Sequence, residues 1–575
     1  MATKSLTRWQ LVSGGLTLLA YRTLFSSLPV VAQSSTPSQP SPSPAFTPAQ
    51  TNSTADFCPQ AQYSPSQNQV RREAPTGTIQ VRGYTRLSDA EVTQEIDQAI
   101  AASQGRSLSL EKLAEAVVDR LNLLYISKGY ITSSVAPERT PIENGVGLLA
   151  TEGYIGTIKV EGRQRLSLAY ICRRAQLGIT FPVQKDRLEE QLRLLRTDPL
   201  FTNVEASLGA VTGARLGESI LSLRVIESKA FNGSLGADNY SPPSVGSERL
   251  GGAISYRNLT GLGDAINASY YRSTTGGSNS LDFNYRIPVN PMNGSILLRT
   301  ALSRNKITDP QFDELNIRAN NNLYEITYRQ PLIRLVEKEF ALSLGFSAEN
   351  GQTFLFQDTP FPFGIGPDAE GNSRTRILRF GQEYVKRDPS GAWGLRSQFS
   401  FGLNIWGATK NPDPIPDGQF FSWLGQAQRV QRINDNNLLI IQADVQLTFN
   451  SLLPAQQYIL GGGQSVRGFR QNARSGDNGF RFSIEDRIAI VRDKNGLPIV
   501  QLAPFFDAGA VWNKSGNPNL LPDQTFLAGT GLGIIYEPLR GFVIRLDYAR
   551  PLVELRDRGN NAQDEGFYFS VGITL

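Results

Sequence analysis

Histidine is absent from the 575-residue sequence, and cysteine occurs only twice, as Cys58 and Cys172. Without an imidazole the chain cannot form a Ser-His triad, and the commonest zinc and iron ligand sets are excluded. The two cysteines form no Cys-x-x-Cys motif. Their wide separation favours two unrelated thiols, and a single disulfide between them stays open as the alternative. We therefore expect a protein that is not an enzyme and that has no cofactor.

The sequence also lacks a concentration of positive charge and has no long apolar segment after its N-terminus. Lysine and arginine total 57 against 52 acidic residues, and the basic residues are dispersed, which argues against a nucleic-acid partner. No uninterrupted apolar run of about 18 residues, the length of a helical membrane span, follows position 32. The chain is too long for one ordinary core, so at least two domains are expected. Its 53 glycines, 29 phenylalanines and 19 tyrosines suit an all-β protein.

The N-terminus has the pattern of an exported protein. Lys4 and Arg8 precede an apolar stretch, and the Val-Val-Ala sequence ending at Ala32 fits a signal-peptidase site. Residues 33–75 form a Ser/Pro-rich linker, a composition that cannot bury a core. We predict a signal peptide over residues 1–32, followed by a flexible tether.

Two consecutive segments of about 75 residues then repeat one order of elements. Each opens on a strand followed by glycine, "TIQVRG" from Thr78 and "TIKVEG" from Thr157. Each continues with one amphipathic helix, the first with Ser109 as its N-cap, and with two further strands. The apolar helix faces are Leu113, Val117, Leu121 and Leu124 in the first segment, and Leu188, Leu192 and Leu195 in the second. Small sheets of this kind expose strand edges that can bind an extended peptide, and a rigid spacer is the alternative.

From about Phe231 onward the sequence alternates apolar and polar residues in short runs. In "FVIRLDYA" (542–549) one face is apolar and the other carries Arg545 and Asp547. Charges on the second face indicate a wet interior, and aromatic residues near strand ends indicate interfacial girdles. A closed barrel is the β structure that can span a bilayer, because every backbone group pairs. We count about 16 strands, with the lead residues Leu235, Leu250, Ile266, Leu281, Ile296, Leu323, Phe340, Ile377, Leu395, Phe420, Leu438, Phe480, Ile499, Phe526, Phe542 and Phe567.

A glycine- and arginine-rich stretch, "GGGQSVRGFRQNARSGDNGF" (461–480), lies between the eleventh and twelfth of these runs. It lacks the Lys-Ser/Thr of a phosphate-binding loop, and the later "GTGLG" (529–533) lacks the βαβ context of a dinucleotide site. If the chain enters the barrel from the periplasm, the stretch belongs to the sixth extracellular loop. The next expected strand contains "FFDAG", with Phe505, Asp507 and Gly509.

The order of the two modules, the strands and the two motifs resembles that of the ShlB/FhaC/HecB family of haemolysin secretion/activation proteins, the TpsB transporters of two-partner secretion. "SVRGF" is similar to the family's Val-Arg-Gly-Phe/Tyr motif, here Val466, Arg467, Gly468 and Phe469. "FFDAG" is similar to the barrel-wall motif that meets it. The resemblance covers about Thr76 to Leu575.

The resemblance implies α+β periplasmic POTRA repeats followed by an all-β transmembrane barrel of about 16 antiparallel strands. The expected POTRA domains cover residues 76–154 and 155–228, and the barrel covers residues 229–575. Loop 461–479 is expected to fold inward, with Arg467 paired with Asp507, since an arginine offers a rigid fork to a carboxylate.

The implied function is export of an unfolded partner exoprotein, captured in the periplasm by the POTRA domains and conducted through the barrel to the cell surface. The implied location is the lipid of the outer membrane, reached with the barrel-assembly machinery. An insertase or organellar-type import channel of the same superfamily is the alternative, although such proteins usually carry more POTRA repeats. Many family members carry a plug helix after the signal peptide, but residues 33–75 show no amphipathic helix.

Overall fold

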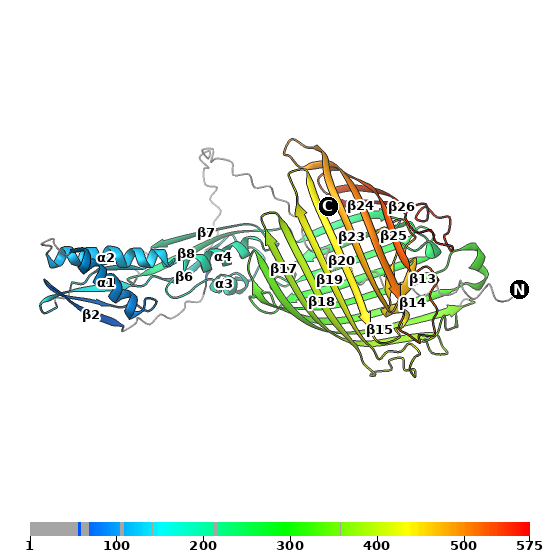
Figure 1. The fold of residues 1–575 in the computed structure, drawn as a ribbon, viewed down its shortest axis with the longest axis horizontal. Helices are drawn as coiled ribbons and strands as arrows, with labels where there is room; N and C mark the ends of the chain where they lie inside the picture. The colour runs from blue at the N-terminus through cyan, green and yellow to red at the C-terminus, as the bar shows by residue number, and fades with distance from the viewer. Residues whose placement is uncertain (1–55, 59–67, 104–108, 140–141, 211–214, 357) are drawn as a thin grey trace. The chain divides into compact units, whose positions relative to one another are not determined.

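The computed structural model describes residues 56–58, 68–103, 109–139, 142–210, 215–356 and 358–575 (Figure 1). The expected signal peptide (1–32), and most of the segment expected as a linker without a plug helix (33–75), lie outside the described residues. The described chain divides into two compact units, one of residues up to 229 with residues 260–263, and one of the remaining residues from 230 on. Among the described residues, no helix is both long and apolar enough to cross a membrane.

The first module is a four-stranded sheet with two helices packed against it. The sheet order is β2 (Gln69–Ala74), β3 (Gly77–Arg82), β5 (Gly145–Thr151) and β4 (Ser134–Pro137), and the helices are α1 (Asp89–Ser103) and α2 (Leu110–Ser127). The expected face of α2 is in the core, where Leu113, Val117 and Leu121 are buried. Ser109 caps this helix as expected, by accepting a hydrogen bond from the Lys112 backbone N–H.

The second module repeats this arrangement. Its sheet order is β1 (Asp56–Phe57), β6 (Tyr154–Glu161), β8 (Glu218–Glu227) and β7 (Phe201–Ala210), and its helices are α3 (Leu168–Gln176) and α4 (Lys185–Arg196). Among its described residues, each module therefore has two helices where the sequence pattern predicts one. The interpretation of residues 33–75 as a tether is also wrong in part, because strands β1 and β2 lie within that range and pair with the two sheets.

A disulfide joins Cys58 to Cys172, so the expectation of two unrelated thiols is wrong. Strand β1 pairs with the edge of β6, and the Cys58 backbone N–H donates to the Ile158 carbonyl at 3.0 Å. This pairing places Cys58 in the core of the second module against Cys172 on α3. Sequence separation, here 114 residues, says little about distance once the chain folds back as an edge strand.

The second unit is a barrel that sixteen long antiparallel strands close within the described residues (Figure 1). The strands are β9 (Phe231–Asp238), β10 (Arg249–Arg257), β11 (Ala265–Ser273), β12 (Ser278–Pro288), β13 (Ser295–Lys306), β14 (Arg318–Arg334), β15 (Lys338–Leu355), β17 (Asn372–Asp388), β18 (Gly391–Gly402), β19 (Phe421–Arg432), β20 (Asn437–Thr448), β23 (Asn478–Arg492), β24 (Pro498–Trp512), β25 (Phe526–Leu539), β26 (Phe542–Pro551) and β27 (Phe567–Thr574). The two-residue strand β16 (Thr359–Pro360) pairs antiparallel with the end of β15. The expected sixteen-stranded barrel is confirmed: fifteen lead residues lie in their strands, and Phe420 directly precedes β19.

The two faces of the strands differ as the alternation predicts. On β26, Tyr548 is 51% exposed, whereas the neighbouring Asp547 is 3% exposed. Large apolar side chains cover the outer surface, among them Leu235, Leu281, Tyr324, Leu344, Trp393, Phe480 and Phe506. Charged side chains pair on the inner surface, as in the buried contact between Arg299 and Asp282, whose Nε and Oδ2 atoms are 2.8 Å apart. Such alternation is that of a barrel with lipid outside and polar groups inside.

Candidate functional site

The connection between β20 and β23 is the sixth loop at the end of the barrel where odd strands connect to even strands; we call this loop L6 (residues 449–477). Two short strands, β21 (Tyr458–Leu460) and β22 (Arg474–Gly476), pair at its base, and residues 461–473 form its tip. The tip lies against barrel strands, because its Val466 and Phe469 are buried with Val511 of β24 and Leu527 of β25. An apolar contact of this kind holds L6 in the barrel interior.

Arg467 is the centre of the L6 tip. Its Nε and Nη2 donate to the two carboxylate oxygens of Asp507 at 2.6 and 3.0 Å, and its backbone N–H donates to the same carboxylate at 3.2 Å. Asp507 lies on β24 and is fully buried. The guanidinium carbon also lies 3.3 Å from the centre of the Phe505 ring, a cation–π contact. The structure thus brings together Arg467, Phe505 and Asp507 of the two motifs, as the resemblance implies.

A second carboxylate, Glu485 of β23, completes the surroundings of Arg467. The Nη1 of Arg467 donates to Glu485 Oε2 at 2.7 Å. Glu485 also accepts from Arg545 at 2.7 Å and from Arg487 at 2.8 Å. Arg545 in turn binds Asp547 at 2.8 Å. The network balances three arginines with three carboxylates, which matters because an unpaired charge in such a site is costly.

Gly468 lets the L6 backbone turn beside Arg467. Its φ is +99°, a conformation that favours glycine, and a Cβ there would lie 3.0 Å from the Pro551 backbone nitrogen. Its N–H donates to the Tyr568 hydroxyl at 2.9 Å, and that hydroxyl donates to the Phe469 carbonyl at 2.7 Å. Tyr568 of β27 therefore binds the motif backbone on both sides of the turn, a role that the sequence pattern did not indicate.

Two wall glycines make room for L6. A Cβ on Gly529 of β25 would lie 2.0 Å from the Arg467 carbonyl oxygen. A Cβ on Gly509 of β24 would lie 3.1 Å from the Leu460 side chain and 2.5 Å from the Phe480 carbonyl oxygen. The "GTGLG" run is thus part of a wall against which a loop packs. Close approach of two backbones, and not a dinucleotide, explains its first glycine.

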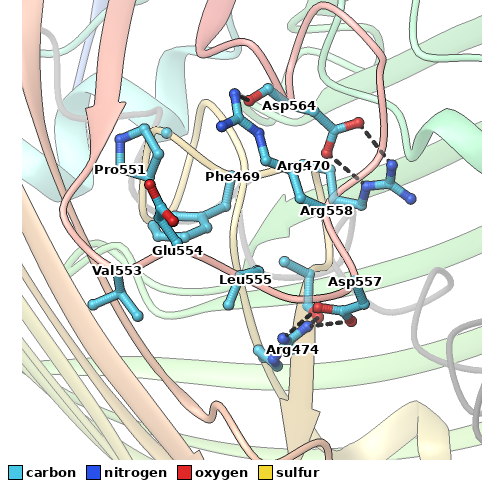
Figure 2. Close-up of a pocket in the computed structure, with 12 residues that line it drawn as sticks. Phe469, Arg470, Arg474, Pro551, Val553, Glu554, Leu555, Asp557, Arg558 and Asp564 are labelled. Atoms are coloured by element: carbon cyan, nitrogen blue, oxygen red, sulfur yellow. Dashed lines mark hydrogen bonds and ion pairs between the residues drawn. The ribbon is translucent and has the colours of Figure 1, made fainter.

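Two further arginines of L6 bind the connection between β26 and β27, which we call L8 (residues 552–566). Figure 2 shows Arg470 and Arg474 reaching Asp564 and Asp557. Arg470 binds Asp564 through two contacts of 2.8 and 2.7 Å, and Arg474 binds Asp557 through contacts of 3.0 and 2.8 Å. The sequence shows these arginines, but their partners lie more than eighty positions away. Sequence periodicity does not predict contacts between loops so far apart in the chain.

Metal chemistry finds no support in the part of the chain that the structure describes. No group of three or more His, Cys, Asp or Glu side chains there could hold a metal ion. The acidic residues named above are instead bound by arginines. What this arrangement can do chemically is hold a loop by charge and hydrogen bonds, contacts that break and reform without covalent change.

Comparison with known proteins gives a consistent result. The family model described as haemolysin secretion/activation protein ShlB/FhaC/HecB matches residues 217–536, and the model described as POTRA domain, ShlB-type, matches residues 75–153. The heme/hemopexin transporter protein HuxB of Haemophilus influenzae is 21% identical over 89% of each chain. The outer membrane transporter CdiB of Escherichia coli is 26% identical over 70% of this chain and 67% of its own.

Solved structures share the fold. CdiB from Escherichia coli matches with a TM-score of 0.65 and 21% identity, over 90% of this chain and 93% of its own. BamA from Haemophilus ducreyi lacking POTRA domains 1–3 matches with a TM-score of 0.51 and 16% identity, over 88% of this chain and 99% of its own.

Proposed function

Because the chain belongs to the ShlB/FhaC/HecB family of haemolysin secretion/activation proteins, we propose that its POTRA modules capture an unfolded partner exoprotein and that its barrel carries this client to the cell surface. It is an outer-membrane protein with its POTRA region in the periplasm. The relatives named as transporters, among them CdiB and HuxB, support transport as the activity.

The observation that carries the proposal is the position of Arg467, on a loop that lies in the barrel interior and is held there by side-chain contacts. Strands β20 and β23, which flank this loop, pair with each other along their own ladder. L6 can therefore leave the wall without a change of strand register. A removable loop inside a closed barrel suits the passage of a polypeptide better than it suits a porin with a permanently fixed opening.

Capture of the client is assigned to the exposed sheet edges of the modules. An extended chain can pair with an unoccupied edge strand through backbone hydrogen bonds, without a requirement for one sequence. In the second module, β1 already pairs with β6 on one side of the sheet, and the ten-residue strand β7 forms the other side. In the first module, β2 and β4 form the two sides. These edges suit an unfolded client, since unfolded chains present backbone groups throughout.

Deletion of residues 76–227 tests the division of labour between modules and barrel. The deletion variant should also carry Cys58→Ser, because the deletion removes the partner thiol at position 172. We expect loss of client binding, measured with purified protein and denatured client, and retention of ion conduction in planar bilayers. The Cys58→Ser, Cys172→Ser full-length protein is the matched control. Client binding that survives the deletion would assign capture to the barrel instead.

A further inference from the structure

The barrel closes between its first and last strands through a short ladder. Strands β9 and β27 pair at five positions, from Asp238 opposite Ser570 to Ser234 opposite Thr574. The ladders on either side hold eight pairs between β9 and β10, and seven between β26 and β27. Two backbone hydrogen bonds continue this ladder at its ends, from the Asn239 N–H to the Phe569 carbonyl at 3.3 Å and from the Leu575 N–H to the Gly233 carbonyl at 2.8 Å. We call this closure the seam, and because its ladder is the shortest of the three we take it as the easiest of them to open.

One side chain extends the seam beyond its ladder. Asn239 follows β9 in the first loop, L1 (residues 239–248), and is buried. Its Nδ2 donates to the Phe567 carbonyl at 2.9 Å, and its Oδ1 accepts from the Phe569 N–H at 2.9 Å. The side-chain amide of Asn239 thus stands in for a backbone partner of β27. At this end of the barrel, closure depends on loop residues.

Gln563 of L8 joins three loops at this place. Its side chain is fully buried. Its Nε2 donates to the L1 carbonyls of Asn239 and of Ser241, the latter at 2.8 Å, and its Oε1 accepts from the Gln471 backbone N–H of L6 at 2.7 Å. The side-chain amide of Gln563 therefore donates to L1, on one side of the seam, and accepts from L6.

The neighbouring residue strengthens the link between L8 and L6. Asp564 is 3% exposed and accepts from two guanidinium nitrogens of Arg470 (Figure 2). It also accepts from the Asn561 N–H at 3.0 Å, which fixes the carboxylate within L8. A charge-assisted pair of this geometry holds more strongly than a neutral hydrogen bond.

From these contacts we propose that Gln563 and Asp564 form a clasp that couples the position of L6 to closure of the seam. When L6 is in place, Gln563 of L8 binds both L1 and L6, Arg470 of L6 binds Asp564 of L8, and the β9–β27 ladder is closed. When L6 leaves, the Gln563 acceptor loses the Gln471 N–H and the Asp564 carboxylate loses Arg470, and the seam loosens before any other ladder. The coupling is a property of the barrel and holds whether or not the chain exports a client.

Hydrogen–deuterium exchange of the purified full-length protein tests the coupling. We expect Gln563→Ala and Arg470→Ala each to speed exchange in peptides covering β9 and β27 about fivefold, the scale set by one lost buried hydrogen bond. Exchange in peptides covering β14 and β15 should stay unchanged. Arg556→Ala is the control, because Arg556 lies on the same loop with its side chain 83% exposed, and it should leave the seam unchanged.

Two further variants keep the test decisive. Arg470→Asp combined with Asp564→Arg should restore slow exchange at the seam, since the pair is re-formed with its charges reversed. If Gln563→Ala does not fold, Gln563→Glu replaces it, because the glutamate keeps the acceptor for Gln471 and loses the donors to L1. Seam exchange that stays slow in all single variants, or that rises equally in β14 and β15, would overturn the coupling.

Discussion

All three guanidinium nitrogens of Arg467 donate hydrogen bonds to two buried carboxylates, those of Asp507 and Glu485. A lysine at this position would keep the charge but could not fork between the two acids. The Phe505 ring under the guanidinium adds a contact that also prefers the flat group. At the residue scale the site is thus specific for arginine, and each of its partners depends on that choice.

Substitution of Arg467 or Asp507 should therefore reduce export. Removal of one partner from a buried ion pair leaves an uncompensated charge and costs about 3–5 kcal/mol. We expect Arg467→Ala and Asp507→Ala to lower the amount of client in the medium and the temperature at which the barrel unfolds, and Arg467→Lys to have an intermediate effect. The modules should remain folded, as judged by unchanged hydrogen–deuterium exchange in peptides from residues 76–227 of the full-length variants.

The double variant Arg467→Ala, Asp507→Ala sharpens this test, because it removes both charges together. Its unfolding temperature should exceed the value expected from adding the two single effects. Arg432→Ala, an exposed barrel arginine, serves as the matched control. Normal export by both single variants would refute a role of the pair in transport.

The motif residues could be predicted from the sequence because they are local: Val466 to Phe469 and Phe505 to Gly509 are short strings. Glu485, Gly529 and Tyr568 could not be predicted, since they reach the same place through three other strands. Alternation predicts which residues of a strand face inward, but it does not give the height of each strand relative to the next. The partners of Arg467 depend on that register.

At the element scale, the missed helices carried a readable signal. Ser88 and Glu91 at the start of α1 form a capping box: the Ser88 N–H donates to Glu91 at 2.9 Å, and the Glu91 N–H donates to the Ser88 hydroxyl at 3.3 Å. The pKa of the Glu91 carboxyl is lowered to about 2, mainly by its hydrogen bond from the Lys128 ammonium and next by the hydrogen bond from the Ser88 N–H. Ser167 likewise caps α3. The strand β1 gave no comparable signal, because two residues are too few for periodicity.

The similarity between the two modules extends beyond the strand followed by glycine that opens each of them. Glu152 accepts from the backbone N–H groups of Thr85 and Arg86 at 2.8 and 3.0 Å. In the second module, Glu227 accepts from the Gln164 and Arg165 N–H groups at 2.8 and 2.9 Å. A nearly buried carboxylate thus holds the same turn in both modules, which supports a common fold for the two segments.

The Cys58–Cys172 disulfide should stabilise the modules, because it closes a loop across 114 residues that include the whole first module. We expect Cys58→Ser with Cys172→Ser to lower the free energy of unfolding of residues 44–229 by about 2–4 kcal/mol. Urea unfolding followed by circular dichroism measures this difference. The unsubstituted fragment in a thiol reductant should match the variant, and equal stability of the oxidised and substituted proteins would contradict the prediction.

At the scale of the whole molecule, the architecture followed from patterns that extend over many residues. Sixteen alternating runs between Phe231 and the C-terminus leave room for little besides a barrel, and the structure closes it with those strands. The loop-to-loop contacts of L6, L8 and L1 lay beyond such reasoning, because they join irregular segments whose paths no periodicity sets. The proposed capture by edge pairing would recognise backbone groups, so it would not depend on one client sequence.

The central claim is export of a partner polypeptide, and the most direct test is to compare secreted proteins with and without this chain. Deletion of the gene should remove at least one large polypeptide from the medium and cell surface, as quantified by mass spectrometry, and expression of the full chain should restore it. The abundance of other outer-membrane barrels should stay the same. Unchanged secretion, together with a loss of those barrels, would contradict the account and identify the protein as an assembly factor.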